Sequence, residues 1–518
     1  MQSIVAGMPP EREGAVSELT ADVLIIGSGM GGACVAAGLS SSGASVVILE
    51  RGEQLPASQH ARNTRSIFID GYYRPDERWL DTEGEAFNPG CYYYVGGNTK
   101  FYGAVLLRLR ERDFGILEHA DGVSPAWPVG YGEFEPWYCA AEQMFRVRGA
   151  LGEDPTEPPH SVPYTFPPVP DEPAIALARE RLLRVGLKPF SLPLAVDVES
   201  WLAHGQTPWD AYPDTRSGKF DAETAALAVA LKTQTVRLVT GAKVERLTLE
   251  RDGRHVSGVD YIRNGVKQTV GAKLVILAAG AVNSAAILLR STSAQHPQGL
   301  ANRSGVVGRH FMNHNATAML TLDPRNVNGS VYQKTFGLND FYFDDGRGGP
   351  PLGNVQLLGR VSAPILKASL PRVPNIALQW VSRHSVDWYL MSEDLPDPDS
   401  RVSVDGDAII LAWKRTNMTA HLGLVRRMKE VFRAAGYPFV FSRAFDRKTP
   451  SHQCGTIRFG TDPATSALDP YCRAHDHPNL FVVDASFMPS SAAVNPSLTV
   501  AAQALRVADH IQKTGFAD

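Results

Sequence analysis

Residues 21–32 read Ala-Asp-Val-Leu-Ile-Ile-Gly-Ser-Gly-Met-Gly-Gly. The apolar run at 21–26 predicts a buried parallel strand, and the glycines after it fit the pattern G-x-G-x-x-G. A helix of small residues should follow, and then a second strand over 45–49 that ends at Glu50. Strand, glycine-rich turn, helix and acidic strand end, in this order, predict a unit that binds a dinucleotide.

The glycines of this turn have separate tasks. Gly27 makes the tight turn, Gly29 lets the backbone approach a pyrophosphate, and Gly32 lets the helix pack on the strand. Glu50 stands where a carboxylate accepts hydrogen bonds from an adenosine ribose, which disfavours a 2′-phosphate even with Arg51 beside it. The motif itself does not distinguish NAD from FAD.

The composition describes a globular chain without a charge bias. Of 518 residues, 44% are hydrophobic and 20% are charged, and the net charge is −3, so neither nucleic acid nor an anionic membrane is expected as a partner. The five cysteines form no C-x-x-C pair, which favours a reducing compartment over a disulfide framework. No apolar signal segment opens the chain and no apolar run reaches about 20 residues, so a cytoplasmic protein is expected.

A second crossover of the same kind lies further along the chain. Residues 235–249 and 256–263 alternate like paired strands around a turn at 252–253. Residues 274–280 predict another buried strand ending in glycine, and a helix over 284–290 follows. These crossovers predict one discontinuous cofactor domain after a loose leader over 1–18; its three pieces are 19–110, 225–312 and 448–518.

The pattern changes in residues 313–447. An amphipathic helix is predicted over 422–434. Four alternating segments predict an antiparallel sheet: 317–322, 353–358, 376–381 and 402–413. We expect this part to form a substrate-binding domain. The predicted fold class is α/β, a Rossmann-like domain with an inserted substrate domain built on an antiparallel sheet with helices.

Residues 111–224 are expected to connect the two domains. Aromatic and apolar spacing predicts helices within 127–146 and over 175–185. Between them, residues 155–173 are dense in proline and fit a lid, a subunit arm or a plain connector.

Most of the 14 histidines are expected to be structural. His475 and His477 flank Asp476 in a polar turn and point apart, so no metal site is expected. His310 and His314 are spaced i, i+4, and His314 is expected to anchor a turn near the cofactor.

The C-terminal part combines His452, a buried strand that ends at Asp484, and a helix that begins with Asn495 and Pro496. Asn495 fits the N-cap of this helix and Pro496 its first position. A buried helix N-terminus presents free N–H groups and partial positive charge, so an electron-rich group is expected in front of it. From the residues alone, His452 and Asn495 fit structural and catalytic roles equally.

Together these motifs resemble those of the glucose–methanol–choline (GMC) oxidoreductases. The resemblance spans the chain and rests on residues 27–32, 50–52, 96–104, 279–284, 307–309, 452, 484 and 495–496. The loop 95–104 and the Asn-Pro pair are similar to the pyranose oxidase branch, and within it to bacterial FAD-dependent glucoside 3-oxidases acting on C-glycosides and sugars. Some pyranose oxidases link the flavin to a histidine in this loop. Phe101 stands there in this chain, so the resemblance implies non-covalent FAD.

The resemblance also implies roles for the site residues. The helix that Pro496 opens would face the N1–C2=O edge of the flavin and stabilise negative charge there. His452 would accept the hydroxyl proton of the substrate while Asn495 holds that hydroxyl. Val244 would meet adenine through its backbone. Residues implied in cofactor binding are Gly27, Ser28, Gly29, Gly32, Glu50, Arg51, Gly97, Asn98, Thr99, Gly103, Ala104, Val244, Asp484, Asn495, Pro496 and Thr499.

The implied function is oxidation of a secondary hydroxyl of a pyranose sugar or glycoside to a ketone. C3 is favoured over C2, and O2 or another acceptor would reoxidise the FAD. Gln356 and Gln379, on the inserted sheet, are expected to contact the sugar. Open alternatives are a sugar dehydrogenase with a quinone-type acceptor, a redox-silent GMC-type lyase and an NAD enzyme. The sequence carries no signal for an oligomeric state.

Overall fold

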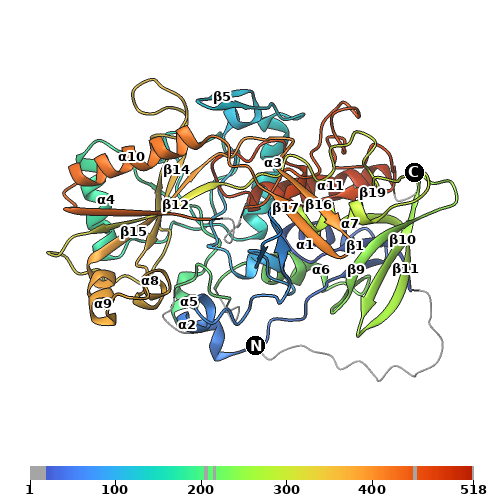
Figure 1. The fold of residues 1–518 in the computed structure, drawn as a ribbon, viewed down its shortest axis with the longest axis horizontal. Coiled ribbons are helices and arrows are strands. Elements are labelled where there is room, and N and C mark those ends of the chain that lie inside the picture. The colour runs from blue at the N-terminus through green and yellow to red at the C-terminus, as the bar shows by residue number, and fades with distance from the viewer. Residues whose placement is uncertain (1–18, 204–207, 214–217, 447–451, 516–518) are drawn as a thin grey trace.

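A computed structural model describes residues 19–203, 208–213, 218–446 and 452–515. The predicted leader lies outside these residues, as do residues 448–451 at the start of the third cofactor-domain piece. Two large sheets stand side by side, with β1, β9, β10 and β11 in one and β12, β14 and β15 in the other (Figure 1). Within the described residues, no helix has the length and apolar character needed to cross a membrane.

The first sheet has seven strands in the order β8-β2-β1-β11-β10-β9, and β19 also pairs with β11. The strands are β1 Leu19–Ile26, β2 Val46–Leu49, β8 Val236–Val239, β9 Lys243–Leu249, β10 Val256–Arg263, β11 Val266–Leu277 and β19 Leu480–Val482. β11 pairs antiparallel with β10 along its first half and parallel with β1 and β19 towards its end. Its parallel core is buried on both faces, as the apolar runs predicted.

The strand predicted over 235–249 is in fact two strands. β8 pairs parallel with β2 at one edge of the sheet, whereas β9 pairs antiparallel with β10 at the other edge. Gly241 lies between the two strands at φ +65°, a left-handed conformation that glycine adopts without strain and that interrupts the extended chain. The turn predicted at 252–253 is confirmed: Gly253 has φ +67° and its N–H donates to the carbonyl of Glu250.

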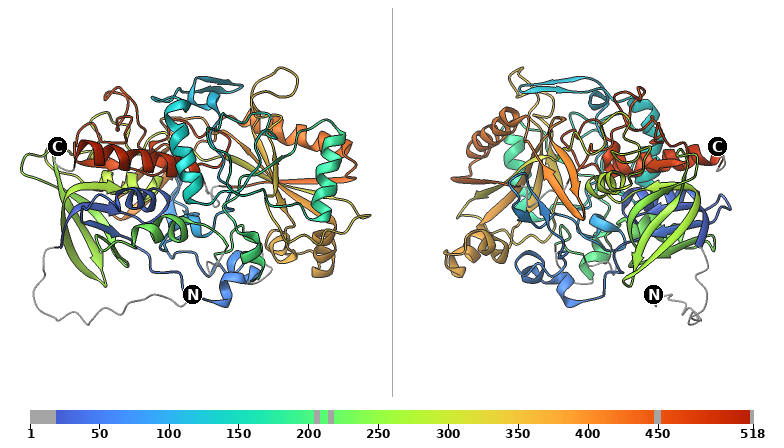
Figure 2. Two further views of the ribbon diagram at one scale, coloured as in Figure 1. Left: turned by 180° about the vertical axis from the view of Figure 1, so that it is seen from behind. Right: turned by 45° about the vertical axis from the view of Figure 1, so that its right-hand side comes forward.

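Helices α1 Met30–Leu39 and α7 Ala281–Arg290 contact strands of this sheet, and α3 Tyr131–Met144 and α11 Ser497–Thr514 belong to the same half of the molecule. α11 packs against α1 and α3. The packing with α1 is close, since a Cβ on Gly38 would lie 2.5 Å from that of Ala508. Figures 1 and 2 show α11 running from the junction of the two sheets to the outer end of the molecule. Its N-terminus therefore lies where the two halves meet.

The second sheet has six strands in the order β18-β12-β15-β14-β13-β7, all antiparallel. They are β7 Phe190–Ser191, β12 Asn315–Leu322, β13 Phe336–Leu338, β14 Asn354–Gly359, β15 Ser385–Ser392 and β18 Phe439–Ala444. Helices α4 Pro173–Arg184 and α10 Met418–Ala434 pack on one face through a separate apolar core that includes Trp388, Leu424 and Phe432. The opposite face of this sheet borders the candidate active site.

Three predictions about this region are wrong. Residues 376–381 are not a strand but part of α9 Asn375–His384, in which Leu378 and Ser382 are buried one turn apart. Residues 402–413 belong to a separate four-stranded sheet, in which β16 Arg401–Asp405 and β17 Ala408–Ala412 join β3 Trp79–Leu80 and β4 Ala86–Phe87. The segment predicted as a connector contributes β7 to the six-stranded sheet. Short apolar runs fit both helix and strand, so periodicity alone did not separate them.

The proline-dense stretch 155–173 packs on the body of the protein. The Arg148 side chain donates to the carbonyl of Pro167, and Ser161 donates to the carboxylate of Glu135 on α3. The hydroxyl of Tyr131 donates to the carbonyl of Pro159. The role of residues 155–173 as a lid or an arm stays a prediction.

Candidate active site

The turn at the end of β1 leaves room beside one of its glycines. A Cβ on Gly27, which has φ +101°, would lie 2.4 Å from the carbonyl oxygen of Ala278, and one on Gly32 would lie 2.0 Å from that of Gly27. At Gly29 no atom lies within 4 Å of the Cβ position. Gly27 and Gly32 are therefore needed for packing, while Gly29 borders open space beside the N–H groups that begin α1.

Glu50 holds this turn together. Its carboxylate accepts from the N–H and hydroxyl of Ser28, at 2.9 and 2.7 Å, and from the N–H of Gly52 at 2.8 Å. Burial raises the pKa of Glu50 in spite of these bonds. The neighbouring Arg51 pairs with Glu77 at 2.6 Å. The ribose contact expected of Glu50 stays a prediction.

The loop 95–104 approaches the same turn. Gly97 has φ +57°, and a Cβ on it would lie 3.4 Å from the Cα of Gly29. The Asn98 side chain accepts from the N–H of Tyr92, and the Thr99 hydroxyl donates to the carbonyl of Gly96. These two side chains stabilise the loop itself.

The end of the loop lies against the second sheet. A Cβ on Gly103 would lie 2.4 Å from the Cε of Lys334, so a side chain there would displace the end of that lysine. Ala104 adopts a left-handed conformation at φ +58°. Phe101 is buried and its ring stacks on that of Tyr92 at 3.7 Å. The end of the loop is therefore in direct contact with the segment that leads into β13 of the second sheet.

Three other predicted cofactor residues have partners within the protein. Asp484, just after β19, accepts from the N–H of Gly280 and the hydroxyl of Ser284, and so ties the end of β19 to the second crossover. Val244 lies in β9, paired with Tyr261 of β10. The Thr499 hydroxyl is 2.9 Å from that of Tyr138 on α3.

His452 and Asn495 face one another, with His452 Nε2 3.4 Å from Asn495 Nδ2. The backbone N–H of His452 donates to Asn313 Oδ1 at 2.9 Å. Burial lowers the pKa of His452 well below its ordinary value, and any proton on the neighbouring His314, together with the charge of Lys334, lowers it further. His452 is therefore a neutral imidazole at neutral pH, which is the form that accepts a proton.

The capping role predicted for the Asn495 side chain is wrong. α11 begins at Ser497 with Pro496 at its N-cap, and no side chain caps it. The Asn495 amide is used elsewhere, because Gln356 Nε2 donates to Asn495 Oδ1 at 2.6 Å. The helix end is thus left with its first N–H groups free.

The two glutamines predicted as sugar contacts differ. Gln356 lies on β14, fully buried, and bonds directly to Asn495. Gln379 is exposed on α9, so its expected place on the inserted sheet is wrong. Its helix lies at the far end of the second sheet from α11 (Figure 1).

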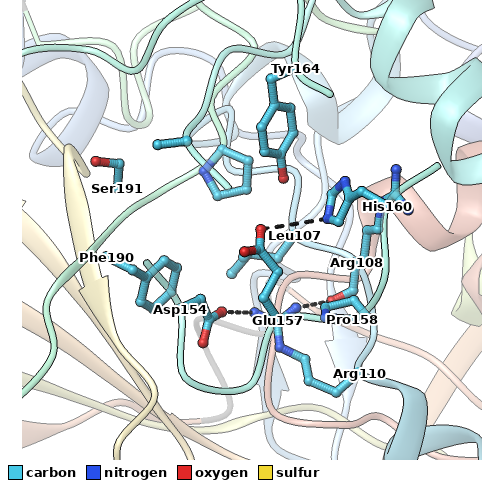
Figure 3. Close-up of a pocket in the computed structure, with 12 residues that line it drawn as sticks. Leu107, Arg108, Arg110, Asp154, Glu157, Pro158, His160, Tyr164, Phe190 and Ser191 are labelled. Atoms are coloured by element: carbon cyan, nitrogen blue, oxygen red, sulfur yellow. Dashed lines mark hydrogen bonds and ion pairs between the residues drawn. The ribbon is translucent and has the colours of Figure 1, made fainter. Parts of the chain in front are cut away.

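A hollow away from His452 and Asn495, shown in Figure 3, lies beside the proline-dense stretch and is lined by residues that include Arg108, Arg110, Asp154, His160 and Tyr164. Its cations already have carboxylate partners, since Arg108 pairs with Glu142 at 2.6 Å and Arg110 with Asp154 at 2.5 Å. Figure 3 shows Glu157 directed at the His160 ring, 3.6 Å away. The two arginines are therefore paired within the packing of this stretch, whereas His160 Nδ1 has no hydrogen-bond partner among the described residues.

Two family models described as GMC oxidoreductase match residues 189–316 and 397–504. A third, described as an NAD(P)-binding Rossmann-like domain, matches residues 25–89. The chain belongs to the GMC oxidoreductase family. It is an oxidoreductase of a kind that acts on CH–OH groups.

Relatives match this GMC oxidoreductase over almost its whole length. The 6′′′-hydroxyparomomycin C oxidase of Streptomyces lividus is 29% identical, over 97% of this chain and 94% of that protein. The fructose dehydrogenase large subunit of Gluconobacter japonicus is 26% identical, over 95% and 98%. The structure of pyridoxine 4-oxidase from Mesorbium loti, 21% identical, has the same fold, with a TM-score of 0.65 over 94% of this chain and 98% of that one.

Membership of the family, together with the dinucleotide-binding unit, implies a FAD cofactor. The residues of this GMC oxidoreductase fit such a group. Open space borders Gly29 beside the first N–H groups of α1, where a pyrophosphate is stabilised. The buried first turn of α11 carries no acidic residue, so it can face an electron-rich ring edge.

The sequence did not identify the contacts that two further residues make around His452 and Asn495. His314 Nδ1 lies 2.8 Å from His452 Nδ1, a closer role than the turn anchor that was expected. Lys334, two residues before β13, lies 3.4 Å from Gln356 Oε1 and 3.3 Å from Asp210. Its φ of +55° is uncommon for a lysine, and no sequence pattern indicated it.

The predicted absence of a metal concerns His475, Asp476 and His477. His475 bonds to the hydroxyl of Ser466, Asp476 pairs with Arg303, and His477 donates to the carbonyl of Arg254. Across the described parts of the chain, no group of three histidine, cysteine, aspartate or glutamate side chains could hold a metal ion.

Proposed function

We infer that this GMC oxidoreductase oxidises a secondary hydroxyl of a pyranose sugar or glycoside to a ketone, at C3 in preference to C2. The observation that carries this proposal is the pair His452 and Asn495, 3.4 Å apart in front of the free N-terminus of α11. A relative named for fructose and another named for a paromomycin derivative support a sugar-bearing substrate.

The two side chains would divide the work on the hydroxyl. Asn495 Nδ2 donates a hydrogen bond to the hydroxyl oxygen and orients it, and His452 Nε2 accepts the hydroxyl proton. As the O–H bond breaks and the C=O bond forms, the carbinol hydrogen leaves with its electron pair. Bound FAD would supply the acceptor for this hydride. The FAD would be held non-covalently, because Phe101 stands where some pyranose oxidases carry the histidine that links the flavin.

The protein around the pair favours this proton transfer. The low pKa of His452 keeps its imidazole neutral before the reaction. Gln356 fixes the Asn495 amide, so the hydroxyl would meet a donor that is already oriented. The free N–H groups of α11 stabilise negative charge in front of them without reorganisation.

The test mixes the FAD-loaded enzyme with sugar in the absence of oxygen and follows the flavin absorbance. Wild type should bleach, and His452→Ala should bleach more slowly by about 10²–10⁴-fold, the usual contribution of a positioned base. His255→Ala is the matched control, because this histidine lies on the surface beside Asp252. An unchanged rate in His452→Ala would contradict the proposed role of His452 as the base.

Substrate and acceptor need separate measurements. D-glucose, an O-glucoside and a C-glucoside are compared as substrates, and the products are assigned by NMR. A 3-keto product supports the proposal, whereas an aldehyde at the primary hydroxyl overturns the regiochemistry. Peroxide formed under air identifies an oxidase, and turnover only with a quinone identifies the dehydrogenase alternative. Absence of bleaching with every sugar favours the redox-silent lyase.

A further inference from the structure

One continuous line of hydrogen bonds passes through the proposed catalytic pair. It joins the carbonyl of Ser491 to the ammonium of Lys334 through His314, His452, Asn495 and Gln356. One end of this line can only accept a hydrogen bond and the other end can only donate. The direction of every bond between them is therefore determined.

At the Ser491 end, a backbone carbonyl faces His314 Nε2 at 3.2 Å. A carbonyl only accepts, so His314 Nε2 carries the proton and its Nδ1 has a free lone pair. That Nδ1 lies 2.8 Å from His452 Nδ1. His452 Nδ1 must then be the donor, which leaves His452 Nε2 without a proton.

The Lys334 end gives the same answer independently. An ammonium only donates, so Gln356 turns its oxygen towards Lys334 Nζ and its nitrogen towards Asn495 Oδ1. Asn495 then presents its amide nitrogen to His452 Nε2 at 3.4 Å. A donor at that position again requires an unprotonated Nε2.

The register of the chain brings the two histidines together. Met312 and Cys454 exchange both backbone hydrogen bonds at 3.0 Å in an antiparallel bridge. His314 and His452 each lie two residues from this bridge, in opposite directions along the chain, and so stand opposite one another. Gly455 permits the approach, because a Cβ there would lie 2.5 Å from the carbonyl oxygen of His310.

We propose that His314 is a positioning residue of the reaction, one that holds His452 in the tautomer with its proton on Nδ1. This proposal rests on the proposed role of His452 as the base. When His452 takes the hydroxyl proton on Nε2, its Nδ1–H still donates to His314, and that bond becomes charge-assisted. A neutral imidazole thus performs the orienting task that a carboxylate performs in the Ser-His-Asp triad.

The charges around the two rings favour this arrangement. Lys334 lies on the far side of Gln356 and opposes a proton on His452 at rest. Glu393 lies towards His314, but it is already paired with His119 at 3.1 Å. Burial lowers the pKa of His314, so it stays neutral and keeps the lone pair that the bond needs.

The experiment compares His314→Leu with His314→Asn in the FAD-loaded enzyme. Leucine removes the acceptor, so part of the His452 population should carry its proton on Nε2. We expect kcat/KM for the sugar to fall by roughly 10- to 100-fold, less than for loss of the base itself. Asparagine places an amide oxygen near the former Nδ1 position and should restore most of that loss. Neither variant should alter the melting temperature enough to explain the rates.

A second readout is the tautomer itself, from 15N–1H correlation spectra of protein labelled at histidine. The His452 signals are assigned by their absence in His452→Gln. Wild type and His314→Asn should show a protonated Nδ1 and a bare Nε2, and His314→Leu should show protonated Nε2. A protonated Nε2 in wild type overturns the proposal whether or not His314→Leu folds, as does a Leu variant with the parental rate and pH profile. If instead His452→Gln reduces flavin at the parental rate, the proposed function has failed.

Discussion

Gln356 is the side chain that links the inserted sheet to the proposed catalytic pair. It is fully buried, and its amide lies between Lys334 and Asn495. Removing the partner of a buried polar group destabilises a protein by about 1–3 kcal/mol. Removal of the Gln356 amide would leave the Asn495 side chain unpaired. The orientation of Asn495 therefore depends on a residue from the other half of the molecule.

Replacing Gln356 should reduce turnover without unfolding the protein. We expect Gln356→Leu to lower kcat/KM for the sugar by roughly 5- to 100-fold, because Asn495 Oδ1 loses its donor and the amide can rotate. Gln379→Leu is the control, since Gln379 is exposed on α9 and should be neutral. Equal activity in the two variants would contradict the role of Gln356.

Lys334 should set the acid limb of the pH profile. Its positive charge disfavours protonation of His452, so Lys334→Met should raise the pKa of that imidazole. His452 acts as a base only when unprotonated, and the acid-side fall of kcat/KM should therefore move to higher pH in the variant. Anaerobic flavin reduction measured across the pH range checks this. A shift to lower pH, or none, would show that Lys334 does not act on His452.

In the first strand-turn-helix element, one glycine is needed for close packing and another nearby borders the space for a ligand. A Cβ on Gly31 would lie 1.7 Å from the carbonyl oxygen of Val483, at the end of β19. At Gly29 the same position is open, and its φ of −70° suits any residue. The two glycines lie two positions apart, Gly31 at a variable position of the motif, and they are required for different reasons.

Alanine at these two positions should give different failures. Gly31→Ala forces α1 away from β19, and we expect little folded protein. Gly29→Ala should fold with the melting temperature of the wild-type apoprotein but bind FAD more weakly, since the added methyl occupies the open space. Melting curves of the apoprotein and FAD titration measure both effects. Normal FAD affinity in Gly29→Ala would remove this turn from the cofactor site.

The element predictions succeeded where the pattern was local. The helix over 175–185 and the strands over 317–322 and 353–358 were correct, since their periodicity is carried by consecutive residues. The helix α9 was mistaken for a strand, and β15 and β18 were not predicted. Few residues of α9 are buried, so the spacing of its apolar residues did not indicate a helix with one face packed on the core.

At the scale of the whole molecule, a buried ion pair joins segments distant in sequence. Lys100, in the loop 95–104, lies 3.2 Å from Asp221, and both side chains are fully buried. Glu223 also contacts Lys100. Lys219 donates to the carbonyl of Lys100 and so adds a second link between the same segments. The conformation of the loop is thus set by residues more than a hundred positions away.

Breaking this pair should destabilise the fold more than removing it altogether. We expect Lys100→Met to lower the free energy of unfolding by about 3–5 kcal/mol, because Asp221 is left as an uncompensated buried charge. The double variant Lys100→Met, Asp221→Asn should recover part of that loss. Urea denaturation of the FAD-loaded protein measures the cycle. A double variant less stable than the single one would show that the pair is not coupled.

The sequence by itself determined the cofactor-binding framework. The strand, the glycine spacing and the acidic strand end of residues 21–50 are local requirements of backbone conformation and close packing, so they can be read in order along the chain. Tertiary structure alone decided the surroundings of the proposed catalytic pair. His314 meets His452 across 138 residues, and Gln356 meets Asn495 across 139. Such contacts depend on strand register and on the direction of each side chain, which no local pattern encodes.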